Sequence, residues 1–159
     1  MINWNGKDME RRADKYLSQV ELFRVKVKIK EDEIRELKET LGIHCQAQLE
    51  RVQTGVNIDA ISNEVIKYLN TEDELTRCKT ELVEARDRII NEIFRLSDKY
   101  HVQILTLFYV KDWPMTKIAA DLHYSEAHTY RLYHAALQAF DEVVLKPLYR
   151  EKNKKKAVR

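Results

Sequence analysis

The sequence has few of the residues that interrupt regular structure. Its 159 residues include only 3 glycines and 2 prolines, whereas 44% are hydrophobic and 34% are charged. A mixture of this kind, with so few residues that break helices, favours long helices with solvated outer faces. The predicted fold class is therefore all-α.

Cysteine is also scarce. Cys45 and Cys78 are far apart in the sequence, and two cysteines are too few for a disulfide scaffold. Neither belongs to a set with the spacing of metal ligands, so we expect no metal site. A reduced, cytoplasmic setting is the simplest expectation for such a chain.

Features typical of membrane and secreted proteins are missing too. The first residues, MINWNGKDMERR, lack the apolar core of a signal peptide. The longest nearly uninterrupted apolar run, VQILTLFYV, is too short to cross a bilayer, so no membrane partner is expected. The net charge is only +2, so no overall basic field indicates nucleic acid. Residues 150–159, however, contain six basic residues and one acidic residue.

Hydrophobic residues repeat every seven positions between Met9 and Leu41. This pattern predicts a long helix with a coiled-coil seam, because the spacing alternates between four and three without a slip. The sequence leaves open whether the seam pairs within the chain or between two chains of a homodimer. The two series are Ala13, Val20, Val27, Ile34 and Leu41, and Met9, Tyr16, Phe23, Lys30 and Leu37. For pairing between chains, the expected oligomerisation residues are Val20, Phe23, Val27, Ile34 and Leu37.

A second long helix is predicted from about Asp59 to Leu96, where apolar residues follow one drifting stripe. Residues 7–98 are therefore predicted to form a long-helix oligomerisation region, either a coiled coil or a helical hairpin, with a connector at 42–57.

The pattern changes after Asp98. The segment KYHVQILTLFYV is apolar on nearly every side, which indicates a buried helix. Pro114 then indicates the start of another helix. Residues 99–146 are predicted to form a compact domain of three short helices, and residues 147–159 a basic tail.

Two of these short helices are expected to meet at LHYS, residues 122–125, with Ser125 as the N-cap of the second. Two helices joined by so short a turn, the second with a polar outer face, match a helix-turn-helix. The second helix is expected to bury Thr129, Tyr133, Ala136 and Phe140. Its opposite face is expected to carry Ala127, Arg131, His134 and Gln138.

The segment MTKIAADLHYSEAHTYRLYHAAL resembles the DNA-binding half of sigma-factor region four. More of the chain, from Tyr16 to Val144, resembles a group of phage-encoded late-gene transcriptional regulators, the RinA/ArpU-like group. KYLSQVELFRVKVKIKEDEIRELK is similar to the group's first helix, ERVQTGVN to its connector and ISNEVIKYLNTEDEL to its second-helix start. ILTLFYVKDWPMTKIA is similar to the group's entry into the helix-turn-helix.

The resemblance implies a regulator of packaging or lysis genes, encoded by a phage or prophage, that binds double-stranded DNA in a bacterial host cell. It leaves open whether host RNA polymerase is also a partner. The recognition helix of the group is usually more basic, whereas here Arg131 is the only arginine or lysine between Lys117 and Lys146. The group's connector often has a proline after VQ, and Thr54 stands there in this chain.

We predict that the helix starting at Ser125 docks in the major groove. Arg131 is the best candidate for a base contact, because its planar fork can pair with guanine. Phosphate contacts would come from the start of the preceding helix and from the tail. The predicted DNA-binding residues are Thr116, Lys117, Ala127, His128, Tyr130, Arg131, His134, Lys154, Lys155 and Lys156.

Two alternatives remain open at this stage. One is a small terminase-like DNA-packaging adaptor, which assembles as a ring rather than as a dimer. The other is a protein-interaction module of phage origin that has lost DNA binding. An enzyme is not expected, because the sequence has no glycine-rich phosphate loop, nucleophile motif or metal-ligand set, and no cofactor is expected either.

Overall fold

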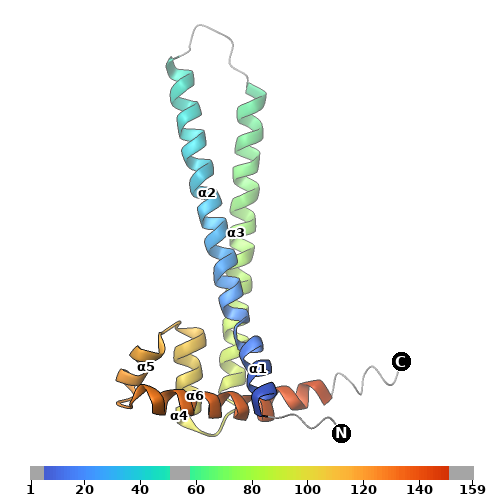
Figure 1. Cartoon of the computed structure of the whole chain (residues 1–159). Coiled ribbons are helices and arrows are strands. Elements are labelled where there is room, and N and C mark those ends of the chain that lie inside the picture. Colours follow the sequence, from blue (N-terminus) through green and yellow to red (C-terminus); the bar gives the residue numbers. More distant parts are fainter. Residues whose placement is uncertain (1–5, 51–57, 151–159) are drawn as a thin grey trace, which may run out of the picture. The chain divides into compact units, whose positions relative to one another are not determined.

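The computed structural model describes the backbone of residues 6–50 and 58–150, and the side chains of residues 6–42 and 63–150. Every regular element in this part of the chain is helical (Figure 1), so the prediction of an all-α fold is confirmed. A search of the described helices finds none with the length and hydropathy needed to span a membrane.

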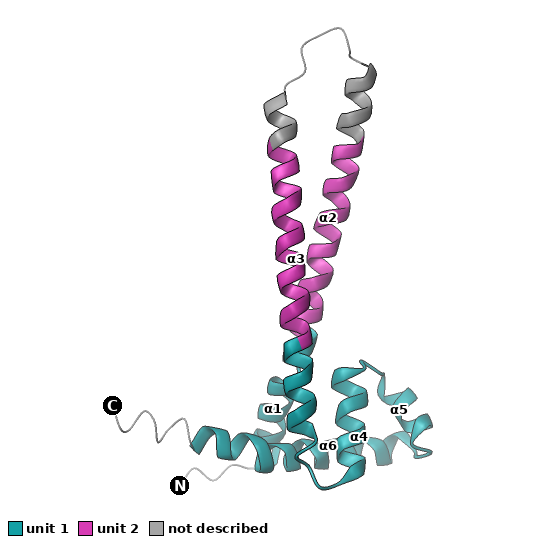
Figure 2. Ribbon diagram, turned by 180° about the vertical axis from the view of Figure 1, so that it is seen from behind, with its two compact units in different colours: residues 1–21, 84–159 teal, residues 22–83 magenta. Residues whose placement is uncertain are grey.

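Contacts divide the chain into two compact units, shown in different colours in Figure 2. Unit 1 comprises residues 1–21 and 84–159, and unit 2 comprises residues 22–83. This division differs from the boundary predicted at residue 98. The reason is that residues near both ends of the predicted long-helix region contact the C-terminal segment: Arg12 Nη2 lies 2.6 Å from Asp141 Oδ2, and Arg95 Nη2 donates to Val143 O over 3.4 Å, all within unit 1.

The first heptad segment forms two helices rather than one. Helix α1 spans Gly6–Leu17 and α2 spans Gln19–Glu50, with a turn at Ser18 between them. Ser18 N still donates to Asp14 O over 2.8 Å, so the interruption is local. Helix α2 also continues into the predicted connector. Four positions of one predicted heptad series are buried, namely Ala13, Val20, Val27 and Ile34.

Unit 2 is an antiparallel pair made by α2 and α3, which spans Ile58–Ile93 (Figures 1 and 2). Lys30 Nζ lies 2.7 Å from Glu74 Oε2, and Lys79 Nζ lies 2.9 Å from Glu31 Oε1. The hydrogen bond from Lys30 holds the pKa of Glu74 below its usual value. The two long helices therefore pair within one chain, which is one of the two arrangements that the sequence left open.

Unit 1 contains the short helices of the C-terminal third. Asp98 caps α4 (Lys99–Leu105) by accepting from Tyr100 N over 2.8 Å, and α4 continues as the π-helical segment η1 (Thr106–Val110). Helix α5 spans Met115–Asp121 and begins directly after Pro114, which is its N-cap; the helix start predicted at this proline is confirmed. Helix α6 spans Glu126–Phe140 and continues as the π-helical segment η2 (Asp141–Leu145). Helix α6 packs against α1, α4 and α5.

The core of unit 1 includes one charged pair. Arg12 Nη2 lies 2.6 Å from Asp141 Oδ2, and the Asp141 side chain is fully buried. Burial raises the pKa of Asp141, and the Arg12 guanidinium opposes that rise. The pair ties α1 to the C-terminal end of α6. The largest fully buried apolar side chains of unit 1 are Leu17, Val20, Ile89, Ile93, Ile104, Leu105, Ile118, Phe140, Val144 and Leu145.

Candidate nucleic-acid interface

The turn between α5 and α6 is built by its own backbone and by one serine. Tyr124 N donates to Ala119 O over 3.0 Å, and His123 takes a positive φ of 57°, which lets the chain reverse after α5. Ser125 Oγ accepts a hydrogen bond from His128 N over 3.3 Å. This bond satisfies one of the backbone donors left unpaired at a helix start. The predicted N-cap is therefore confirmed.

The inner face of α6 follows the predicted spacing. Thr129, Ala136 and Phe140 are completely buried, and the ring of Tyr133 is partly buried. Thr129 Oγ1 also donates to Ser125 O over 3.0 Å, which ties the buried face to the cap. Because 3.6 residues make one turn, this buried face fixes which side of α6 points outward.

The outer face of the first two turns of α6 is accessible. Ala127 and Arg131 are exposed, and the side chain of Tyr130 is 47% exposed. On α5, Thr116 and Lys117 are exposed as well. The structure thus places five of the predicted DNA-binding residues at the surface of two adjoining helices.

His128 is less accessible than predicted for a side chain that contacts DNA. It is half-buried, and its ring meets that of Tyr124 edge to face at a centroid distance of 4.6 Å. Tyr124 in turn contacts Tyr100 of α4 at 6.0 Å. The His128 ring is therefore held against an aromatic cluster next to the turn, and does not extend freely from α6.

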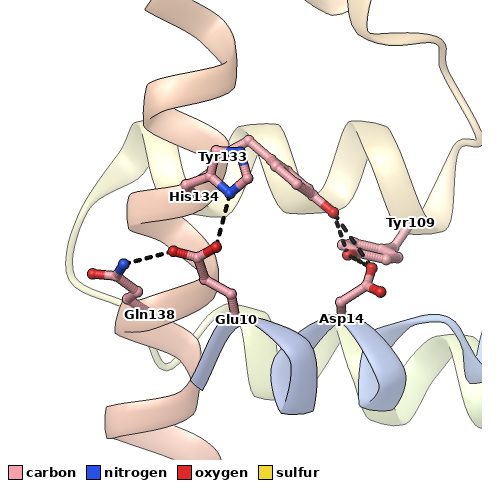
Figure 3. Close-up of polar contacts among 6 residues, drawn as sticks. All are labelled: Glu10, Asp14, Tyr109, Tyr133, His134 and Gln138. Atoms are coloured by element: carbon pink, nitrogen blue, oxygen red, sulfur yellow. Dashed lines mark hydrogen bonds and ion pairs between the residues drawn. The ribbon is translucent and has the colours of Figure 1, made fainter. Parts of the chain in front are cut away.

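The outer face of α6 changes in its third turn, where α1 approaches it (Figure 3). His134 Nδ1 lies 3.0 Å from Glu10 Oε2, and Gln138 Nε2 donates to Glu10 Oε1 over 2.7 Å. The sequence predicted one continuous polar face from Ala127 to Gln138. The structure instead engages the second half of that face with a carboxylate from α1, so only the first half is free of this contact.

A second carboxylate of α1 engages a pair of tyrosines in the same region (Figure 3). Tyr109 Oη donates to Asp14 Oδ1 over 2.5 Å and lies 2.6 Å from Tyr133 Oη. Burial raises the pKa of Tyr133 to about 12, and burial together with the hydrogen bond to Asp14 raises the pKa of Tyr109 further. Both hydroxyls therefore stay protonated at neutral pH and act as donors that fix α1 against η1 and α6.

Sequence reasoning missed an aromatic–basic cluster at the start of α5. Lys117 Nζ lies 3.8 Å from the centroid of the Trp113 ring, and Lys111 Nζ lies 5.5 Å from it. Cation–π contacts of this kind hold ammonium groups against a ring. The four-residue spacing between Trp113 and Lys117 across a helix start was the signal that could have revealed the pair.

The other predicted residues belong to the basic tail and to the heptad seam. Lys154, Lys155 and Lys156 lie outside the described residues. Among the predicted oligomerisation residues, Val20, Val27 and Ile34 are buried within a single chain, and Phe23 and Leu37 are half-buried. Pairing of two chains through Val27 or Ile34 would therefore require the hairpin of unit 2 to open.

Comparison with family models gives no match, and the searches of curated proteins and of solved structures give none either.

Proposed function

We propose that this protein is a sequence-specific DNA-binding regulator of transcription, in which α5, the turn at residues 122–125 and α6 form a helix-turn-helix of the sigma region-four type. The observation that carries the proposal is the position of Arg131. It is exposed on the second turn of α6, while Thr129 and Phe140 anchor the opposite face in the core. A recognition helix reads base edges with residues near its N-terminus, and Arg131 lies there.

In this proposal Arg131 makes the base contact. A bidentate arginine–guanine pair contributes about 1–3 kcal/mol of discrimination between bases. Ala127 lets the helix backbone approach the groove, and Tyr130 reaches a phosphate or a thymine methyl group. His134 is a weaker candidate for a DNA contact than these residues, because its ring nitrogen already faces Glu10.

Contacts to phosphates supply affinity that does not depend on sequence. Thr116 and Lys117 are exposed on the helix that precedes the turn, and the Lys117 ammonium group lies over the Trp113 ring. The tail residues Lys154, Lys155 and Lys156 add to the same term through counterion release. A homodimer would present two reading heads, which raises the overall affinity for a site with two halves.

The biological role that we propose is control of late genes for packaging or lysis in a phage or prophage. This part of the proposal rests on the resemblance of residues 16–144 to the RinA/ArpU-like regulators. Selection of bound fragments from the source genome tests it. Enrichment upstream of a packaging or lysis operon supports this role, and enrichment without relation to such operons contradicts it.

The experiment that tests the reading helix is a competition gel shift with a selected site and a scrambled site. Arg131→Ala is expected to reduce the preference for the selected site about 30-fold, which corresponds to about 2 kcal/mol, the middle of the range for one arginine–guanine contact. Arg86→Ala is a matched control, because Arg86 is an exposed arginine of α3. Unchanged preference in the Arg131 variant would refute the proposed role of this residue.

A protein-interaction module is the second candidate, and the charge of α5 and α6 favours it. Residues 115–140 contain two basic residues, Lys117 and Arg131, and two acidic residues, Asp121 and Glu126. A face without net positive charge gains little from counterion release. Absence of any gel shift at low salt, for the wild-type chain with its tail intact, would favour this second candidate over DNA binding.

A further inference from the structure

Unit 2 leaves several large apolar side chains in contact with water. In its described part, the buried hydrophobic residues are Val27 and Ile34. Two helices alone can shield only the faces that they turn toward each other. Apolar patches that remain exposed mark surfaces that bind other molecules. The exposed large hydrophobic residues of unit 2 are Leu22, Val25, Ile29, Val65, Ile66, Leu69 and Val83.

Three of these residues form a stripe on α2. Leu22, Val25 and Ile29 are spaced by three and four positions, which places them on one side of a helix. Their exposed fractions are 56%, 45% and 52%. Val27 and Ile34 lie on the other side of α2, which is the side turned toward α3. The outer stripe is thus a second apolar face, distinct from the seam that closes the hairpin.

Charges along α2 are segregated around the end of this stripe. Residues 24–30 carry four basic side chains and no acidic one, namely Arg24, Lys26, Lys28 and Lys30. Residues 31–36 carry four acidic side chains and one basic one, namely Glu31, Asp32, Glu33, Glu36 and Arg35. On the outer side of α2, one half of the helix is therefore apolar with basic flanks, and the next half is acidic.

We propose that the outer face of α2 binds the same face of a second copy of this chain, with the two α2 helices antiparallel. The antiparallel direction sets residues 24–28 of one copy beside residues 31–36 of the other, so that basic and acidic side chains meet twice across a two-fold axis near Ile29. A parallel direction would set basic against basic. Opposite charges flanking an apolar stripe determine the orientation of paired helices in this way.

In this antiparallel arrangement, oppositely charged side chains meet on both flanks of the apolar stripe. At 100° per residue, Lys26 and Glu33 lie on one flank, and Lys28 and Asp32 lie on the other. In an antiparallel pair centred near Ile29, Lys26 meets Glu33 of the second copy and Lys28 meets Asp32 of it. A groove of about 410 Å³ beside Ile29, lined by side chains of α2 and α3, has room for side chains of the second copy.

The surface is self-complementary, so two hairpins complete a four-helix arrangement without another protein. This inference does not rest on DNA binding: association through α2 can be measured with the protein alone. It also differs from pairing through the heptad seam, because the seam residues Val27 and Ile34 stay inside each hairpin.

Sedimentation equilibrium of the full chain provides the first test. We expect a dimer, and we expect Val25→Ser with Ile29→Ser to raise its dissociation constant about tenfold or more, because two apolar side chains near the axis are lost. The matched control replaces two exposed apolar residues of unit 1, Phe94→Ser with Val143→Ser. Circular dichroism confirms that each variant keeps its helices.

A charge exchange provides the second test and fixes the direction of pairing. One variant carries Lys26→Glu with Lys28→Glu, and the other carries Asp32→Lys with Glu33→Lys. Each variant alone is expected to be a monomer, because acidic now meets acidic or basic meets basic. An equimolar mixture is expected to restore a dimer that contains one copy of each variant, and native mass spectrometry distinguishes it from either homodimer.

Several results would overturn the proposal. A wild-type chain that remains a monomer at 100 times the concentration used for DNA binding would show that the stripe binds another partner or none. Equal weakening by the Phe94 and Val143 control would locate the interface elsewhere. Dimerisation of either charge variant alone would exclude the antiparallel contact, and a ring of many subunits would exclude a closed two-fold dimer.

Discussion

Glu10 of α1 bridges two residues of α6, and its contact with His134 is a direct one: Oε2 lies 3.0 Å from His134 Nδ1. The other carboxylate oxygen accepts from Gln138. A negative charge is thereby placed beside the helix that we propose enters the major groove. Phosphates approaching that helix would be repelled by this carboxylate and attracted by a protonated imidazole.

Neutralising Glu10 should therefore strengthen DNA binding. We expect Glu10→Gln to tighten binding about 1.4- to 5-fold at low salt, because one charge interaction close to the surface is worth about 0.2–1 kcal/mol. Fluorescence anisotropy with a labelled duplex, measured over a series of salt concentrations, checks the affinity and its salt dependence.

The control for this variant is Glu84→Gln, which removes an exposed carboxylate from α3 instead. If Glu10→Gln binds DNA more weakly than the control does, the contact between Glu10 and α6 positions α6 for binding. The negative charge of Glu10 would then not inhibit DNA binding.

Loss of the buried pair between Arg12 and Asp141 should lower the free energy of unfolding. Arg12→Ala leaves the fully buried Asp141 carboxylate without its guanidinium partner, and loss of one member of a buried pair costs about 3–5 kcal/mol. We expect the lower end of that range, because the Arg12 side chain is 20% exposed. Urea denaturation followed by circular dichroism measures the change, with Arg11→Ala as the exposed neighbouring control.

The same variant should respond to pH in a defined direction. Burial raises the pKa of Asp141, and removal of Arg12 removes the group that opposes this rise. The folded variant then binds a proton more tightly than the unfolded chain does, so its stability decreases as pH rises from about 4 to 7. If Arg12→Ala lowered the free energy of unfolding by the same amount at pH 4 and at pH 7, this account would be contradicted.

The sequence was sufficient for local features and insufficient for contacts between distant segments. Helical periodicity predicted the buried face of α6, and side-chain chemistry predicted the cap at Ser125. The contact between Glu10 and His134 joins residues 124 positions apart, and no local pattern indicates such a pair. The heptads predicted a buried seam in α2, but they could not show that α3 of the same chain would cover it, since either partner satisfies the same pattern.

The hydroxyl cluster of Tyr109 and Tyr133 predicts loss of stability at alkaline pH. Burial raises the pKa of Tyr133 to about 12 from its ordinary value of 10.0. Above pH 10 the unfolded chain loses its tyrosyl protons while the folded protein keeps them, so stability decreases as pH rises through this range. We expect Tyr133→Phe to make that decrease shallower, as measured by thermal unfolding between pH 9 and pH 11.

Tyr130→Phe is the matched control, because it removes a hydroxyl from an exposed ring of the same helix. A pH dependence that is identical in wild type and Tyr133→Phe would show that alkaline unfolding has its origin in other groups. At neutral pH, Tyr133→Phe should cost about 1 kcal/mol for the lost hydrogen bond with Tyr109.

Substitutions of Ser125 distinguish its effect on the stability of α6 from a direct contact with DNA. Ser125→Ala removes the acceptor for His128 N, and loss of an N-cap costs about 1 kcal/mol. The midpoint of thermal unfolding should fall in Ser125→Ala and recover in Ser125→Asn, because asparagine is an equally good cap. Ser97→Ala replaces another exposed serine as the control and should leave the midpoint unchanged.

If Ser125 acts only through the helix start, DNA affinity should recover in Ser125→Asn together with stability. An affinity that stays low in Ser125→Asn while stability recovers would instead mean that the serine hydroxyl contacts a phosphate itself.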